Sequence, residues 1–326
     1  MNTGREDRMR RIAACVALLF VGLVGLAQDP LTLCLDFFPN PNHSPIYVAA
    51  ERGWFEEEGV DLDIVIPANV SDPLKLVAAG RFDVALTPQI NYLIARSEGL
   101  PLIAIGSLID HNLGGLLSLG SSGVRDLGDL RGKRIGYSLA PLEPVLWETM
   151  LGCVGVGGDE IELVNVGFNT VAALLSGGVD AIGAFRNYEL IHVELLGEAT
   201  VFFPQEDYCV PDTEDIIIVC RPEDVRERAS SLRGLLAALS RGVRVVKDDP
   251  DAALADFLHA LPDLDDELNR LSFGATVPLF ASDLALGDAE SWSALQTYLF
   301  AHGLVDQVFD ADVLFTTELL PQSDGS

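Results

Sequence analysis

Short apolar runs alternate with amphipathic, helix-like runs along most of the chain. Apolar runs at residues 60–66, 82–86 and 102–105 predict strands, and a helical pattern at residues 73–79 lies between the first two. Strands that alternate with helices are typical of βαβ units and a largely parallel sheet. The pattern therefore predicts an α/β fold with helices on the faces of the sheet.

A second unit of the same kind follows a polar turn within residues 116–123. Its predicted strands lie at residues 134–137, 161–166 and 179–184, with helices at about 144 onward and at 171–175. The fully apolar run Ile216–Cys220 predicts a strand that crosses back, and helical stretches follow at residues 223–246 and 251–261. We expect these last helices to pack on the first lobe, because too few strands remain for a third domain.

The chain is thus predicted to form two lobes. With 326 residues, of which 49% are hydrophobic, it can bury two cores of ordinary size. We expect the first part of lobe 1 at residues 28–117, lobe 2 at residues 118–220, and a return to lobe 1 with C-terminal helices at residues 221–326.

Residues 1–27 have the composition of a cleavable secretory signal peptide. Four arginines lie within the first eleven residues, an uncharged apolar run covers residues 12–26, and Gly25 and Ala27 supply small residues before Gln28. The run is shorter than the ~20 residues that a transmembrane helix needs. We therefore expect a periplasmic or secreted protein.

The net charge of the chain and the spacing of its cysteines limit which partners and metal sites are expected. Removal of residues 1–27 leaves 17 basic and 47 acidic residues, a formal charge of −30. Nucleic acid is not an expected partner, because phosphate recognition requires a basic surface. The cysteine spacing matches no zinc pattern, and Cys209 with Cys220 is the pair close enough in sequence to propose as a disulfide.

The most informative segment is LCLDFFPNPNHSPIYVAA, a short strand that runs through a polar loop into a helix. Ser44 can cap that helix, Pro45 suits its first turn, and Gly53 can end it. The ligand crevice of an open α/β sheet lies at the carboxyl ends of its strands. We therefore propose as ligand-binding residues Asp36, Phe37, Asn42 and His43. The alternatives are a core position for Phe37 and a local hydrogen bond for His43.

Other predicted strand ends add candidates of the same kind. They are Thr87, Gln89, Glu143, Asn187, Tyr188 and Glu189. Phe37 and Tyr188 can sandwich a flat ring between the lobes, and a carboxylate such as Glu143 suits a ligand with an exocyclic amine. Glu143 can equally be a first-turn glutamate favoured by the helix dipole, and Gln89 can be a helix-start residue. A lone histidine does not make a metal site, so no metal is expected.

Several sequence blocks resemble one family of proteins. LDFFPNPNHSPIYVAAERGWFEEEGVDLDI, DPLKLVAAGRFDVAL, DLRGKRIGYS and VNVGFNTVAALLSGGVDAIGAFRNYEL are similar to blocks of type II periplasmic solute-binding proteins of the thiamin-pyrimidine binding family, which is related to thiamin pyrimidine synthases. The resemblance implies two lobes, each a mostly parallel sheet flanked by helices, joined by two crossover segments. The chain departs from it at Phe37, where these proteins usually carry Trp.

The resemblance implies a function in solute capture. We expect a monomeric binding protein that delivers a thiamin pyrimidine, such as hydroxymethylpyrimidine or its formylamino relative, to the permease and ATPase complex of an ABC importer. We expect no cofactor and no catalysis, because the cysteine-rich CCCFC-like motif of the synthases is absent from the sequence.

Three alternatives remain open from the sequence. The ligand can be another solute, such as riboflavin or an alkanesulfonate. The chain can be a pyrimidine-synthase-like enzyme, which would need a lysine for pyridoxal phosphate and a histidine, with Lys75, His43 and His111 as candidates. It can also be a sensory or scaffold module without a ligand.

Overall fold

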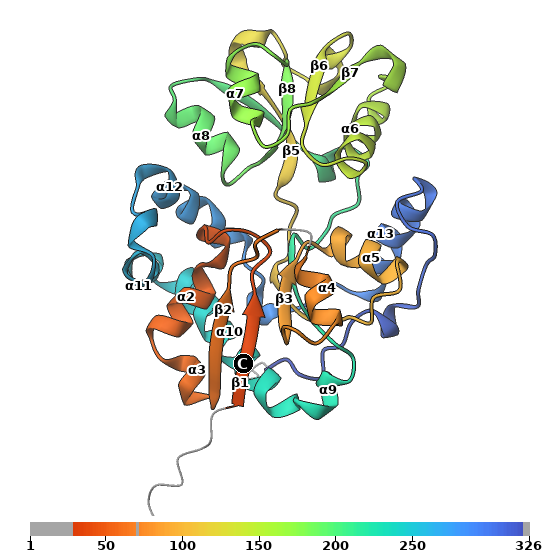
Figure 1. Ribbon diagram of the computed structural model, residues 1–326. Helices are drawn as coiled ribbons and strands as arrows, with labels where there is room; N and C mark the ends of the chain where they lie inside the picture. Colours follow the sequence, from red (N-terminus) through yellow and green to blue (C-terminus); the bar gives the residue numbers. More distant parts are fainter. Residues whose placement is uncertain (1–28, 70–71, 322–326) are drawn as a thin grey trace, which may run out of the picture.

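Two five-stranded sheets organise the protein into two lobes stacked end to end (Figure 1). The computed structural model describes residues 29–69 and 72–321. The signal peptide predicted at residues 1–27 lies outside the described residues. The two-lobed α/β fold expected from the sequence is confirmed.

The lobe 1 sheet has the strand order β2-β1-β3-β10-β4. Its strands are β1 (Asp29–Cys34), β2 (Val60–Val65), β3 (Val84–Thr87), β4 (Ile103–Ile109) and β10 (Ile216–Cys220). β1 pairs in parallel with β2 and β3, whereas β10 is antiparallel to both of its neighbours. Side chains alternate across the sheet, so that Leu33 packs into the core on one face and Cys34 into the core on the other.

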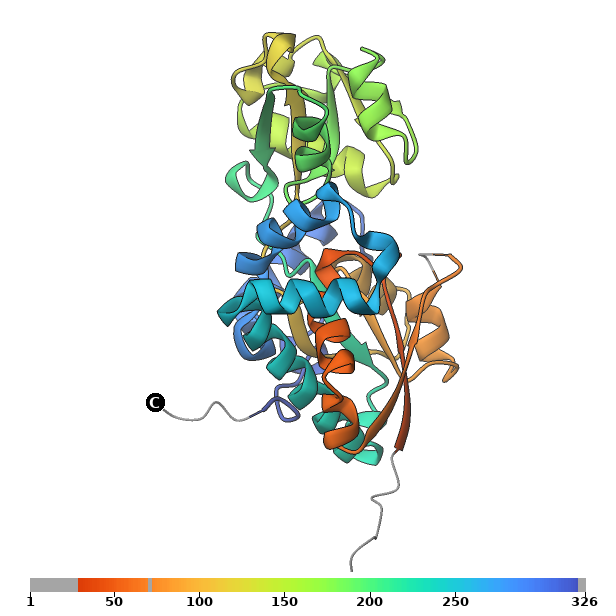
Figure 2. The same cartoon turned by 90° about the vertical axis from the view of Figure 1, so that its left-hand side faces the viewer.

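Helices cover both faces of this sheet (Figure 1). On one face lie α2 (Ser44–Glu51), α3 (Trp54–Glu57), α10 (Ala229–Asp248), α11 (Pro250–Ala260) and α12 (Glu267–Thr276). On the other face lie α4 (Pro73–Ala78), α5 (Gln89–Ser97) and α13 (Ala289–Ala301). The helix α9 (Asp224–Glu227) follows β10. The late helices thus return to lobe 1, and Figure 2 shows α12 at the end of that lobe nearest lobe 2.

Lobe 2 repeats the architecture with the strand order β7-β6-β8-β5-β9. Its strands are β5 (Gly114–Leu119), β6 (Arg134–Tyr137), β7 (Glu162–Asn165), β8 (Ala181–Phe185) and β9 (Thr200–Pro204). Its helices are α6 (Leu142–Cys153), α7 (Thr170–Leu175) and α8 (Glu189–Leu195). β5 is antiparallel to β8 and β9, so each lobe contains one antiparallel strand that follows a crossover.

The crossovers lie a few residues from the predicted boundaries. β5 pairs within lobe 2, although a polar turn was expected from residue 116, because Leu116 and Leu117 fill the lobe 2 cores. β10 pairs within lobe 1, so the second crossover precedes Ile216 instead of including it. The strand β9 was not predicted, since it is short, lies at the sheet edge and ends in Pro204.

A disulfide between Cys153 and Cys209 joins the end of α6 to the segment that leads into the second crossover. The predicted pair Cys209 and Cys220 is therefore wrong. Cys220 belongs to β10 and is buried in the lobe 1 core, as is Cys34 of β1. Among the described residues, none of the helices has the length and apolar character to cross a membrane.

Loss of this disulfide should destabilise the protein. It closes a chain segment with a sequence separation of 56 residues, and removal of such a cross-link costs about 2–4 kcal/mol, chiefly through the unfolded chain. Urea unfolding of the double variant Cys153→Ala/Cys209→Ala measures this loss. Val154→Ala, which truncates an exposed neighbour, is the control. Equal stability of both variants and the parent would contradict the assignment.

Candidate functional site

The carboxyl ends of strands from both lobes point toward the crossovers (Figure 1). Aromatic side chains that follow these ends are unusually exposed: Phe37 by 41%, Phe38 by 62%, Phe168 by 72% and Phe185 by 45%. Phe37 and Phe38 follow β1 in lobe 1, whereas Phe168 and Phe185 lie at the ends of β7 and β8 in lobe 2. Exposed apolar groups at this edge of an α/β sheet mark a candidate ligand cleft.

Phe37 presents its ring at the lobe 1 side of this cleft. It forms an edge-to-face pair with Phe38, with ring centroids 5.3 Å apart and an interplanar angle of 84°. The pairing orients Phe37 while much of its surface stays accessible, so the alternative of a core position does not hold. Phe38, which was not among the predicted ligand contacts, thus lies beside Phe37 in the loop that follows β1.

His43 supports Asp36 and is itself fully buried. The backbone N–H of Asn40 donates to His43 Nδ1 at 3.2 Å, and His43 Nε2 lies 2.8 Å from Asp36 Oδ1. Because Nδ1 accepts a hydrogen bond, the ring proton is on Nε2, which donates to the carboxylate. Both ring nitrogens thus have hydrogen-bond partners within the loop, which is the local alternative considered for His43, and the bond to Oδ1 orients Asp36.

The helix start beside this loop also differs from the prediction. His43 is the N-cap of α2, and Ser44 is its first residue with no side-chain capping bond. Asn40 instead caps the short 3-10 helix Pro41–His43, since its side chain accepts from the backbone N–H of Asn42 at 2.9 Å. Pro45 in the first turn and Gly53, with φ of 70° just after the helix, are as expected.

Glu143 and Glu189 fold back onto the two neighbouring strand ends of lobe 2. Glu143 Oε2 accepts from the backbone N–H of Ser138 at 2.7 Å, and Glu189 Oε2 accepts from that of Phe185 at 2.9 Å. Burial raises the pKa of both carboxyl groups, and the charge of Glu189 raises the pKa of Glu143 further. The two carboxyl groups are therefore close enough for the charge of Glu189 to act on Glu143, and Glu189 is bonded to the backbone of Phe185.

Asn187 links the two lobes. Its Nδ2 donates to Asn42 Oδ1 at 2.7 Å and to Thr276 Oγ1 at 2.9 Å, and its side chain is almost fully buried. Asn42 belongs to the 3-10 helix before α2, and Thr276 ends α12. The two asparagines that were predicted to bind ligand thus bind each other in this conformation.

Tyr188 is half-buried near the start of α12. Burial raises the pKa of its hydroxyl, and the charges of Glu189 and Asp266 add to the effect. Asp266 is the N-cap of α12 in lobe 1. Among the described aromatic pairs, Phe37 pairs with Phe38 and not with Tyr188, so the predicted sandwich is not formed in this conformation.

Thr87 and Gln89 form hydrogen bonds at the end of β3 and with the second crossover. The Thr87 hydroxyl is buried and donates to the carbonyl of Pro88. Gln89 Oε1 accepts from the backbone N–H of Glu214 at 3.0 Å, and the Gln89 N–H donates to the Glu214 carbonyl at 3.1 Å. Both side chains are buried, and these hydrogen bonds give Thr87 Oγ1 and Gln89 Oε1 structural partners, so their ligand contacts stay a prediction.

Asp215 is a candidate that sequence reasoning missed. It lies on the second crossover, where burial and, to a smaller extent, the charge of lobe 1 Asp36 raise its pKa to about 7, against the opposing effects of the Leu113 backbone and lobe 2 Arg186. Arg186 itself forms an ion pair with Glu206. The sequence gives no signal for Asp215, because Asp212, Glu214 and Asp215 are all acidic residues that lie just before an apolar strand, and nothing in the pattern distinguishes one from the others.

The charges at the strand ends favour one class of ligand. Four acids lie there, namely Asp36, Glu143, Glu189 and Asp215, whereas the neighbouring Arg186 is already paired with Glu206. Carboxylates accept hydrogen bonds from N–H groups, most strongly from cationic ones. In the described part of the chain, no group of three or more His, Cys, Asp or Glu side chains is arranged to hold a metal ion.

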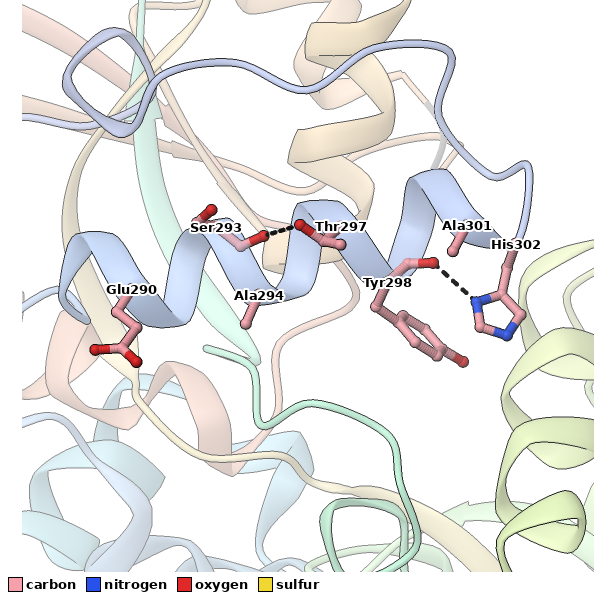
Figure 3. Close-up of a pocket in the computed structure, with 7 residues that line it drawn as sticks. All are labelled: Glu290, Ser293, Ala294, Thr297, Tyr298, Ala301 and His302. Carbon is pink, nitrogen blue, oxygen red and sulfur yellow. Dashed lines mark hydrogen bonds between the residues drawn. The ribbon is translucent and has the colours of Figure 1, made fainter.

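A second concave surface lies outside this cleft, along one side of α13 (Figure 3). It has a volume of about 630 Å³ and is lined by Glu290, Ser293, Ala294, Thr297, Tyr298, Ala301 and His302. All seven residues come from α13 or the residue after it, and none was predicted as a site residue. The groove lacks the paired carboxylates of the strand ends.

Asp215 should make stability depend on pH between 3.8 and about 7. Across this window the folded protein holds a proton that an unfolded Asp has released. The free energy of unfolding should therefore fall as the pH rises, by at most about 1.4 kcal/mol per pH unit. Urea unfolding between pH 5 and 8 should give Asp215→Asn a shallower profile than the parent chain. Parallel profiles would contradict the assignment.

Solved structures share the fold at low sequence identity. The periplasmic aliphatic sulphonate binding protein of Escherichia coli is 14% identical with a TM-score of 0.72, and the match covers 91% of this chain and 94% of that one. A Candida albicans protein described as having the generic periplasmic binding protein fold is 13% identical with a TM-score of 0.66, over 91% and 99% of the two chains. Both likenesses show the fold alone.

Several relatives of the chain have names that refer to thiamin or to its pyrimidine precursor. A Haemophilus influenzae protein named for thiamine biosynthesis is 34% identical, over 88% of this chain and 91% of its own length. The formylaminopyrimidine-binding protein of Halalkalibacterium halodurans is 30% identical, over 89% and 91%. A Legionella pneumophila relative, 28% identical over 91% and 94%, is named 4-amino-5-hydroxymethyl-2-methylpyrimidine phosphate synthase.

These names correct one expectation. The sequence analysis excluded catalysis, yet relatives from Legionella pneumophila, Schizosaccharomyces pombe and Saccharomyces cerevisiae are all named as synthases. The absence of one cysteine motif was too narrow a criterion, because an enzyme and a binding protein can share this fold and most of its sequence blocks.

A family model matches the larger part of the chain. The match covers residues 40–253, which include the loop before α2, all of lobe 2 and the first of the returning helices. Together with the relatives at 30% identity or more, it settles the family. The chain belongs to the NMT1/THI5-like family.

Proposed function

We propose that this protein captures an aminopyrimidine precursor of thiamin, of the hydroxymethylpyrimidine or formylaminopyrimidine type, between its two lobes. The observation that supports this most is the combination of exposed phenylalanines and half-buried carboxylates at the strand ends of both lobes. Phe37 and Asp36 contribute from lobe 1, and Phe185 contributes with Glu143 and Glu189 from lobe 2.

The chemistry of such a ring fits this set of groups. A pyrimidine has two flat apolar faces, which Phe37 and Phe185 can cover, and aromatic pairs add about 0.5–1.5 kcal/mol beyond simple burial. An exocyclic amine donates to carboxylates, and Glu143, Glu189 and Asp36 supply acceptors. Tyr188 can join the aromatic face when the lobes close further, since it lies half-buried at the lobe boundary.

The same charges argue against an anionic ligand. Solved structures with this fold include sulphonate-binding proteins. A sulphonate would meet the acidic side chains of Asp36, Glu143 and Glu189, while Arg186 is paired with Glu206. Like charges at close range disfavour binding, so the proposed ligand is neutral or cationic.

The proposed partner is the permease and ATPase complex of an ABC importer. Support comes from the binding protein named among the relatives, from the periplasmic proteins among the structures, and from the signal-peptide pattern of residues 1–27. In this role the protein would be periplasmic, and closure of the lobes around the ring would create the form that the permease recognises.

A second candidate function is synthesis of the pyrimidine phosphate, which the names of several relatives favour. His43, one of the histidines considered for that chemistry, has both ring nitrogens in hydrogen bonds. Lys75 is exposed on α4, and His111 lies at the first crossover beside Asp110. Mass analysis for a pyrimidine phosphate product after incubation with pyridoxal phosphate and iron tests this candidate.

Titration calorimetry on the chain without residues 1–27 tests the proposed function. The panel contains hydroxymethylpyrimidine, formylaminopyrimidine, thiamin, riboflavin and a short alkanesulfonate. We expect the two pyrimidines to bind and the sulfonate to give no heat. Binding of the sulfonate alone would overturn the proposal.

Removal of an aromatic face should weaken the complex without unfolding the protein. Phe37→Ala and Phe185→Ala should each raise the Kd of the pyrimidine roughly threefold to tenfold, because each loses a stacking partner. Phe300→Ala removes a similarly exposed phenylalanine from α13 and is the control. An unchanged Kd in both cleft variants would place the ligand elsewhere.

Neutral replacements of the lobe 2 carboxylates should change selectivity. Glu143→Gln and Glu189→Gln keep the side-chain size but remove the charged acceptor. Affinity for an aminopyrimidine should fall more than affinity for the corresponding ring without the amine, as measured by the same titrations. Equal losses of affinity for both rings would show that these carboxylates do not bind the exocyclic amine.

A further inference from the structure

We propose that two interlobe tethers, one on each flank of the crossovers, hold the unliganded lobes near their binding distance. The first joins Tyr298 of α13 to Thr149 of α6, and the second joins Asn187 to Asn42 and Thr276. Neither tether requires a bound ligand. They assign positioning roles to Thr149 and Tyr298, which lie outside the proposed binding cleft.

The first tether combines a hydrogen bond with apolar packing. The hydroxyl oxygens of Tyr298 and Thr149 are 2.8 Å apart. Leu142, at the start of α6, and Tyr298 each pack against a lobe 1 core and also against a lobe 2 core. The Tyr298 ring also lies 4.4 Å from that of His302, which fixes its direction on the helix (Figure 3).

The helix that carries Tyr298 is anchored to the hinge itself. Glu214 Oε1, on the second crossover, accepts from the backbone N–H of Gly287 at 2.9 Å and from Trp292 Nε1 at 2.7 Å. Glu214 and Trp292 are buried, and Gln89 holds the backbone of Glu214 from α5. The first turn of α13 is therefore fixed to the second crossover through Trp292, and its later turns contact α6 of lobe 2 through Tyr298.

The second tether closes the opposite flank. Asn187 follows β8, the strand that presents Phe185, and it is 2% exposed between Asn42 and Thr276. The helices α8 and α12 contact each other on this side, and Figure 1 shows them on the opposite flank from α6 and α13. Rotation of lobe 2 away from lobe 1 must break at least one of the two tethers.

The expected consequence is an effect on affinity from a distance. When a fraction of the molecules has a binding-competent geometry, the apparent Kd equals the intrinsic Kd divided by that fraction. Loss of a tether lets the lobes separate and lowers the fraction. This second step rests on the proposed function, whereas the restriction of lobe motion does not.

The test compares Thr149→Val and Tyr298→Phe with Thr297→Val. The first two remove one hydroxyl each from the tether. The control removes a hydroxyl from the same helix that donates to the Ser293 carbonyl within α13. Spin labels at Asp251→Cys and Glu198→Cys, exposed positions on lobes 1 and 2, report the interlobe distance without ligand.

We expect longer or broader interlobe distances in both tether variants and in Asn187→Ala, and parent-like distances in the control. The Kd for the aminopyrimidine should rise roughly twofold to tenfold in the tether variants. Unchanged distances, or tighter binding, would overturn the proposal. If the parent chain binds no pyrimidine, the proposed function fails, and the distance measurement still decides the tethers.

Discussion

The passage of the chain between the lobes at two crossovers, each of which leads into an antiparallel strand, is the constraint on which the rest of the structure depends. β5 and β10 each run antiparallel beside strands that are parallel to one another. The chain must therefore pass twice between the lobes at the carboxyl ends of β1, β3, β6 and β8. The polar loops that follow these strands are gathered there as a result, and the lobes can move about two short segments.

Buried polar contacts fix the crossovers to lobe 1. The Glu214 carboxylate is buried, which raises its pKa, and it accepts hydrogen bonds from the Gly287 backbone N–H and from Trp292 Nε1, while the Glu214 backbone carbonyl accepts from the Gln89 N–H. Leaving such a carboxylate without partners would cost several kcal/mol, so these contacts hold the hinge strand and α13 in one arrangement. The crossovers are thus anchored to lobe 1, and lobe 2 is joined to lobe 1 through them and through the two interlobe tethers.

Much of this architecture could be predicted from the sequence, because it rests on local patterns. The apolar runs at Arg134–Tyr137 and Ile216–Cys220 became strands with those bounds, and Gly53 marks the end of α2 as its conformational freedom suggested. β9 escaped prediction, since a five-residue edge strand that ends in proline has little periodicity to detect. The disulfide partner of Cys209 also could not be derived, because pairing depends on three-dimensional proximity.

The candidate site stays a prediction, and the structure adds detail that the sequence does not carry. Phe37, Asp36, Glu143 and Glu189 lie near the ends of strands, as the pattern of apolar runs indicates. That pattern could not show that His43, Gln89 and Asn187 form hydrogen bonds with neighbouring protein groups, nor that Phe38, Phe185 and Asp215 lie at the same edge. Those distinctions depend on long-range hydrogen bonds and on burial, which residue types and spacing do not encode.

The central claim is that an aminopyrimidine binds between the strand ends of the two lobes. A crystal structure of the protein grown with hydroxymethylpyrimidine tests it most directly. The account predicts the ring between Phe37 of lobe 1 and the Phe185 to Glu189 segment of lobe 2, with its amine donating to a carboxylate of the set Asp36, Glu143 and Glu189. A ring bound in the α13 groove, or on one lobe away from these residues, would contradict it.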